Sequence, residues 1–230
     1  MFWNLFDPLW LLFAIPGLLI GIWAQIKLSH AYGKYSKVPV ESGMTGAQAA
    51  REILDRAGLN NVPIEEIPGH LSDHYDPTKR ALFLSSENFR GRTVAAVGVA
   101  AHESGHALQH QAAYGLFNFR MAIVPVTQFA SQLLPFIMIG GFWFHMFALL
   151  KIGVLVYLVL TVFQLVTLPV EFDASRRAKI ILQNMGFVQA GPEAVGVNKV
   201  LDAAALTYVA AFIAALGNLL YLLSITQRRN

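Results

Sequence analysis

Four long stretches of this 230-residue chain contain no Asp, Glu, Lys or Arg: residues 8–26, 121–150, 152–170 and 203–227. A helix that spans a bilayer needs about 20 mostly apolar residues, and each stretch is close to that length or longer. Only 13% of the residues are charged, whereas soluble domains contain about 25%. The chain is therefore expected to be a mainly α-helical, multi-pass membrane protein with about four transmembrane helices.

These stretches divide the chain into five segments. No Lys or Arg precedes the first stretch and no small-residue cleavage site follows it, which favours a retained anchor over a signal peptide. The predicted segments are a transmembrane anchor (1–26), a polar segment (27–120), a transmembrane hairpin that turns near 140–147 (121–170), a second polar segment (171–202), and a last transmembrane helix with a short tail (203–230).

The basic residues indicate an orientation. Fourteen of the seventeen Lys and Arg residues fall in the two polar segments or at their borders. Since such residues are retained on the cytoplasmic side, both polar segments are expected in the cytoplasm, on a protein of the cell membrane. The net charge of +3 follows from this topology and gives no reason to expect a nucleic-acid partner. The chain has no Cys, which excludes disulfides and Cys-ligated zinc.

The first polar segment contains a His-Glu-x-x-His motif, formed by His102, Glu103 and His106. Small and apolar residues lead into it from Thr93, as expected for a buried helix. Residues four apart share a helix face, so His102 and His106 are predicted to bind one Zn²⁺ ion. Glu103 would lie beside that ion as the general base that takes a proton from water.

Catalytic zinc takes three protein ligands and leaves one position open. Glu171 is the predicted third ligand, because a carboxylate next to an apolar span is costly unless a cation pairs with it. Asp173 is the competing ligand. A third possibility is that Glu171 pairs with Arg176 or Arg177 at a solvated helix end.

Local patterns predict a small α+β arrangement in the first polar segment. A helix begins after Thr45, a candidate N-cap, and ends before Gly58. Short strands are predicted at 62–67, 74–76 and 80–85, with a turn at 76–79 between the last two. The motif helix follows, over about residues 92–114. An edge strand beside such a helix can hold an extended peptide through main-chain hydrogen bonds.

Taken together, His102–His106 and the Glu-Phe-Asp-Ala-Ser sequence at 171–175 resemble the multi-span gluzincins of the HtpX and CaaX-processing type. Those proteins pair His-Glu-x-x-His with a downstream Glu-x-x-x-Asp. The segments 69–77 and 82–85, together with the motif, resemble the YugP-like neutral zinc metallopeptidases of bacteria over nearly the whole chain. The resemblance implies a zincin-like cytoplasmic part, zinc on His102, His106 and Glu171, and Glu103 as base. Ser175 stands where the HtpX pattern has Asp, so Asp173 or another group is expected to orient a ligand histidine.

Two classes of function fit these features. The first is a zinc-dependent metalloendopeptidase whose partners are the lipid bilayer and a peptide or membrane-protein substrate. The alternative is a non-proteolytic zinc-binding scaffold or a transporter-like protein. The case for a transporter is weakened because the predicted spans contain no carboxylate. Three further histidines are not expected to be ligands: His70 and His74, which lie on a loop and a strand, and His110, which lies further along the motif helix.

Overall fold

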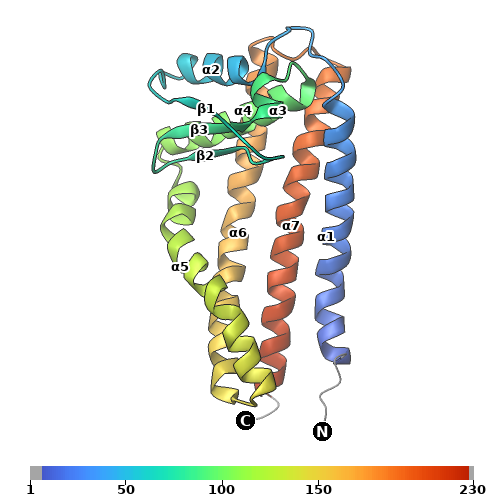
Figure 1. Ribbon diagram of the computed structural model, residues 1–230, viewed down its shortest axis with the longest axis vertical. Coiled ribbons are helices and arrows are strands. Elements are labelled where there is room, and N and C mark those ends of the chain that lie inside the picture. The colour runs from blue at the N-terminus through green and yellow to red at the C-terminus, as the bar shows by residue number, and fades with distance from the viewer. Residues whose placement is uncertain (1–6, 228–230) are drawn as a thin grey trace. The chain divides into compact units, whose positions relative to one another are not determined.

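The computed structural model describes residues 7–227 (Figure 1). Residues 1–6 and 228–230, including Arg228 and Arg229, lie outside the described residues, so the outer ends of the first and last predicted segments are not considered further. The elements are α1 (Pro8–Tyr35), α2 (Gly46–Arg56), β1 (Ile64–Ile67), β2 (His74–Asp76), β3 (Ala81–Ser85), α3 (Ser86–Arg90), α4 (Val94–Gln111), α5 (Gly115–Met138), a π-helical turn (Ile139–Trp143), α6 (Phe147–Asn184) and α7 (Pro192–Gln227).

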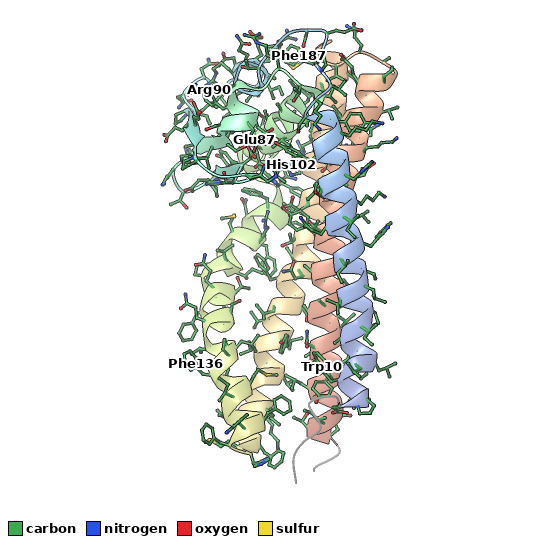
Figure 2. All side chains as sticks on the ribbon, turned by 45° about the vertical axis from the view of Figure 1, so that its right-hand side comes forward. Trp10, Glu87, Arg90, His102, Phe136 and Phe187 are labelled. Carbon is green, nitrogen blue, oxygen red and sulfur yellow. The ribbon has the colours of Figure 1, made fainter. Side chains whose placement is uncertain are left out.

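Four helices within residues 7–227 are long and apolar enough to cross a membrane: α1, α5 with its π-helical turn, α6 and α7. These helices expose large apolar side chains, including Trp10 on α1 and Phe136 on α5 (Figure 2). Phe136 is 72% exposed, which would be costly in water and is normal against lipid tails. The predicted fold class, mainly α with four membrane helices and a small sheet, is confirmed.

The chain forms two compact units, which the long helices connect. The membrane unit comprises residues 7–24, 118–169 and 206–227 of the described chain. Within it α1 and α7 pack closely. A Cβ atom added to Gly17 would lie only 2.7 Å from the Cα of Ala214. A Cβ atom on Gly217 would likewise lie 2.3 Å from the carbonyl oxygen of Phe13. Small residues at such contacts let membrane helices approach and gain dispersion energy.

The polar unit comprises residues 25–117 and 170–205. Its sheet has the order β1-β3-β2, with β1 parallel and β2 antiparallel to the central β3 (Figure 1). All five residues of β3 are buried. Leu82 and Leu84 of β3 pack with Leu54 of α2 and Ala100 of α4 in one apolar cluster. This cluster fixes α4 against the sheet, and β2 is left as an edge strand.

Local sequence signals were reliable in the polar unit. Thr45 caps α2, and the Gln48 side chain completes the capping box. The Asp76 carboxylate accepts hydrogen bonds from the backbone N–H groups of Thr78 and Lys79, which forms the predicted turn. Helix α4 is shorter than predicted at both ends, since Thr93 caps its start and Ala113 adopts a φ of 49° just after it. The short helix α3 was not predicted.

Glu171 marks a change of composition, but no helix ends there. Helix α6 begins at Phe147 in the apolar stretch and continues through Glu171 to Asn184. The rigid helix therefore sets the direction of the Glu171 side chain.

Candidate metal centre

Helix α4 presents His102, labelled in Figure 2, and His106 on one face. Their rings lie edge to face with centroids 4.8 Å apart. The helix is anchored at its start by Thr93, whose hydroxyl accepts a hydrogen bond from the N–H of Ala96. The two imidazoles therefore project from consecutive turns of one regular helix, as the four-residue spacing predicts.

Glu171 reaches the same point from α6. Its Oε2 atom lies 3.2 Å from Nε2 of His102 and 3.6 Å from Nε2 of His106. One ligand atom from each of the three residues fits within a 4.8 Å span. Glu171 is 2% exposed and His106 7%. The structure thus brings together the three residues that the sequence analysis proposed as ligands.

A glycine inside the motif allows this approach. A Cβ atom on Gly105 would lie 2.9 Å from the carbonyl oxygen of Ala174 and 3.3 Å from its Cα. Helix α4 therefore passes α6 at backbone contact distance, and Ala174 on the opposite side is itself small and fully buried. Because Glu171 lies one turn before Ala174, this close crossing positions its carboxylate at the two histidines.

The three donor atoms fit a zinc ion. Zinc–nitrogen and zinc–oxygen bonds of about 2.0–2.1 Å at tetrahedral angles separate neighbouring ligand atoms by about 3.3 Å. The two distances to Glu171, 3.2 and 3.6 Å, bracket this value. Two imidazoles and one carboxylate leave the fourth tetrahedral position for water, which is the arrangement of a catalytic site.

Gln109 selects the tautomer of the neutral His106 ring. The Gln109 amide nitrogen donates to the carbonyl oxygen of Val170 at 2.8 Å and to Oδ2 of Asp173 at 3.0 Å. Both contacts require a donor, so the amide oxygen must face Nδ1 of His106, 2.9 Å away. That ring nitrogen therefore carries the proton, and Nε2 keeps a free lone pair towards Glu171. The sequence analysis did not identify Gln109, although its position three residues after His106 was a usable signal.

Ser175 lies next to His102, the other histidine of the motif. Its hydroxyl oxygen lies 3.2 Å from Nδ1 of His102, and the Ser175 residue is 4% exposed. The serine that replaces the Asp of the HtpX pattern thus contacts a ligand histidine directly. The sequence analysis expected Asp173 or another group to orient a ligand histidine; Asp173 reaches His106 through Gln109, and Ser175 itself lies next to His102.

Asp173 does not join the metal-binding group of the described residues. Its carboxylate accepts hydrogen bonds from Gln109, from Arg177 at 2.5 Å and from Arg176. The two guanidinium groups that could have competed for Glu171 therefore pair with Asp173.

Glu103 lies beside the three convergent donors, buried against the sheet. Its Oε2 atom accepts a hydrogen bond of 3.1 Å from the backbone N–H of Tyr75 in β2. Burial, followed by the negative charge of Glu171, raises the pKa of the Glu103 carboxyl to about 7. The contact to Tyr75 also shows that the outer edge of β2 faces the candidate base.

The loop before β2 is fixed by Asp73, which the sequence analysis did not single out. The Asp73 carboxylate accepts hydrogen bonds from the backbone N–H of Ser85 at 2.8 Å and from the side-chain amide of Asn88 at 2.8 Å. These bonds join the loop to the end of β3 and to α3. They hold Tyr75, two residues later, in position next to Glu103.

Three further histidines of the polar segment, His70, His74 and His110, stay outside the cluster. Nδ1 of His70 lies 2.7 Å from Glu87, and Nδ1 of His74 lies 2.8 Å from the carbonyl oxygen of Ser72. Nδ1 of His110 lies 2.9 Å from the Tyr75 hydroxyl. None of the three belongs to the metal-binding group found in residues 7–227.

Comparison with known proteins gives one family and one similar protein. The family model described as "Putative neutral zinc metallopeptidase" matches residues 10–227. A protein of Bacillus subtilis (strain 168) described as "Putative membrane protease YugP" is 48% identical over 212 residues, which cover 92% of this chain and 94% of that protein. No solved structure shows significant similarity.

The Gly105→Ala variant tests the helix crossing. The added methyl group would meet the α6 backbone, so overpacking of about 1–3 kcal/mol and displacement of Glu171 are expected. Zinc content per chain and the thermal midpoint should both fall. Gly98→Ala on the same helix is the control, because its Cβ would meet Val197 at an ordinary 3.6 Å. Full zinc content in Gly105→Ala would contradict the role given to this contact.

The Gln109→Leu variant tests the proton assignment on His106. Loss of the amide oxygen leaves the Nδ1–H group without its acceptor, and the loss of such partners lowers metal affinity by about 10–100-fold. Zinc affinity is measured by competition with a chelator. Gln111→Leu serves as the control, since the Gln111 amide bonds to the Ala57 carbonyl oxygen at 2.7 Å, away from the histidines. Equal affinities in the two variants would refute the assignment.

Proposed function

Because this chain belongs to the neutral zinc metallopeptidase family, we propose that it is an integral membrane metalloendopeptidase of gluzincin type. In this proposal His102, His106 and Glu171 hold the zinc ion, and Glu103 is the general base. The observation that carries it is the convergence of three donor atoms, from the half-buried His102 and the buried His106 and Glu171, on one point beside the buried Glu103 carboxylate.

The chain's own residues divide the chemistry between them. When bound, zinc supplies Lewis-acid chemistry, polarising a peptide carbonyl and lowering the pKa of water towards about 7. Glu103 accepts the proton of the attacking water and returns it to the leaving amine. The N–H of Tyr75 holds the Glu103 carboxylate in position at 3.1 Å. Gln109 and Ser175 keep the two imidazoles oriented, with Nε2 directed at the zinc site.

The edge strand β2 offers a place for the peptide. Its inner edge pairs with β3, and its outer edge lies on the side of Glu103. An extended substrate lying along that edge would form main-chain hydrogen bonds with groups other than the Tyr75 N–H, which Glu103 occupies, and would pass beside the base. Such binding depends little on side-chain identity, which suits a peptidase that acts on unfolded segments or on loops of membrane proteins.

The positive-inside rule supports cytoplasmic chemistry. Of the seventeen Lys and Arg residues, ten lie between Lys27 and Arg120 and four between 171 and 202. Since the proposed ligands and base belong to those same segments, hydrolysis would take place near the cytoplasmic face.

The orientation can be tested by cysteine labelling, because the chain has no Cys of its own. Two exposed residues are each replaced by Cys: Glu65, on β1 of the polar unit, and His145, in the connection between α5 and α6. On intact cells a membrane-impermeant maleimide should label His145→Cys, and it should label Glu65→Cys only after permeabilisation. The reverse pattern would place the site outside the cytoplasm and reject this part of the proposal.

The Glu103→Gln variant tests the base. Gln keeps the shape of the side chain but cannot accept the proton, so zinc content should stay at the wild-type level while cleavage of an unfolded protein such as casein falls by at least about 100-fold. Glu52→Gln, on the exposed face of α2, is the matched control and should cleave normally. His106→Ala and Glu171→Ala should lose both zinc and cleavage. Normal turnover by Glu103→Gln would reject the assigned base, and zinc binding without cleavage by the wild type would favour a non-proteolytic role.

A further inference from the structure

A cavity of about 370 Å³ lies in the polar unit and is lined on α4 by Ala107, one helical turn after the proposed base. It is lined in part by Tyr75, Lys79, Arg80 and His110, and we call it the basic pocket. Its volume is within the range of ligand-binding pockets. The ten residues that line it include two cations and no Asp or Glu. The pocket is therefore electrostatically suited to an anionic group.

Tyr75 connects the basic pocket to the catalytic centre. Its backbone N–H bonds to Glu103 at 3.1 Å, and its hydroxyl lies 2.9 Å from Nδ1 of His110 at the pocket. Along α4, Ala107 and His110 follow Glu103 by four and seven residues. At 1.5 Å per residue, seven residues cover about 10 Å along the helix axis. An extended peptide covers that distance in about three residues.

Arg80 is held in a backbone conformation that few side chains adopt. Its φ is 50°, in the left-handed region that favours glycine. This conformation ends the turn at 76–79, where the chain enters β3, and it fixes the direction in which the Arg80 side chain leaves the backbone. Within residues 7–227 its guanidinium group forms no ion pair with a carboxylate. Arg80 and His110 line the same pocket. Burial lowers the pKa of His110, and the Arg80 charge lowers it further.

We propose that the basic pocket binds a carboxylate of the peptide substrate, two or three residues from the bond that is cleaved, and so gives the enzyme a preference for acidic segments. This inference rests on the proposed peptidase function. The carboxylate has two possible sources, an Asp or Glu side chain or the free C-terminus of the peptide. Lys79 and Arg80 are exposed, so their attraction is screened by salt.

The test measures binding rather than turnover. Full-length, zinc-loaded Glu103→Gln protein in detergent is titrated into fluorescein-labelled, alanine-rich octapeptides, and binding is followed by anisotropy. Three peptide pools carry an amidated C-terminus and a single Glu, Gln or Lys at varied internal positions. A fourth pool carries Gln and a free C-terminal carboxylate. Comparison of the first pool with the fourth distinguishes the two sources.

The Glu pool should bind about fivefold more tightly than the Gln pool, and the difference should shrink in 1 M salt, where the screening length is about 3 Å. Arg80→Asn, added to the same background, should abolish the preference, because Asn tolerates a positive φ but carries no charge. Arg80→Glu should reverse it in favour of the Lys pool. Arg90→Gln, an exposed arginine outside the pocket, is the control and should leave the preference unchanged.

If only the free-carboxylate pool binds more tightly than the amidated Gln pool, the pocket binds the C-terminal carboxylate of a peptide rather than a side chain. Equal binding of all four pools, no measurable binding of any pool, or a preference that survives Arg80→Asn would overturn the proposal. Cleavage of the same peptides by the wild-type protein is scored separately. Absence of zinc-dependent cleavage would reject the peptidase function while leaving the binding result to decide the role of the pocket.

Discussion

The backbone contact between Gly105 of α4 and Ala174 of α6 is the constraint on which the metal centre depends. At this crossing a Cβ atom would lie 2.9 Å from a carbonyl oxygen, so a larger residue would force the two helices apart. The histidines and Glu171 come from different helices, and their donor atoms meet only at this separation. Backbone atoms cannot be repacked as side chains can, which makes the crossing a rigid determinant of the site.

Around the three donors, a polar network fixes protons as well as positions. The Gln109 amide is held by two acceptors, Val170 and Asp173, and so must offer its oxygen to His106. Ser175 faces the outer nitrogen of His102 with a hydroxyl that can donate or accept, and so holds the position of this ring. Because buried polar groups are costly when unpaired, the network favours a single arrangement of both imidazoles. In that arrangement His106 keeps its lone pair directed at the point that Glu171 also reaches.

Tyr75 joins the chemistry to the proposed recognition of substrate. Its backbone contacts Glu103, its hydroxyl contacts His110, and its strand is the free edge of the sheet. Asp73 anchors the preceding loop to β3 and α3. The segment 69–77 thus contacts the base, forms the edge strand and lines the basic pocket. The same segment also carried the family resemblance.

The sequence by itself determined whatever depends on local spacing or composition. Four uncharged stretches predicted the membrane helices, the four-residue spacing placed His102 and His106 on one face, and the apolar setting of Glu171 identified it as their partner. Only the tertiary structure decided which groups orient the histidines. Ser175 of α6 reaches His102 of α4, and the amide of Gln109, on the same helix as His106, is held by Val170 and Asp173 of α6. It also decided the basic pocket, which forms where a hairpin with Arg80 in a left-handed conformation folds beside α4.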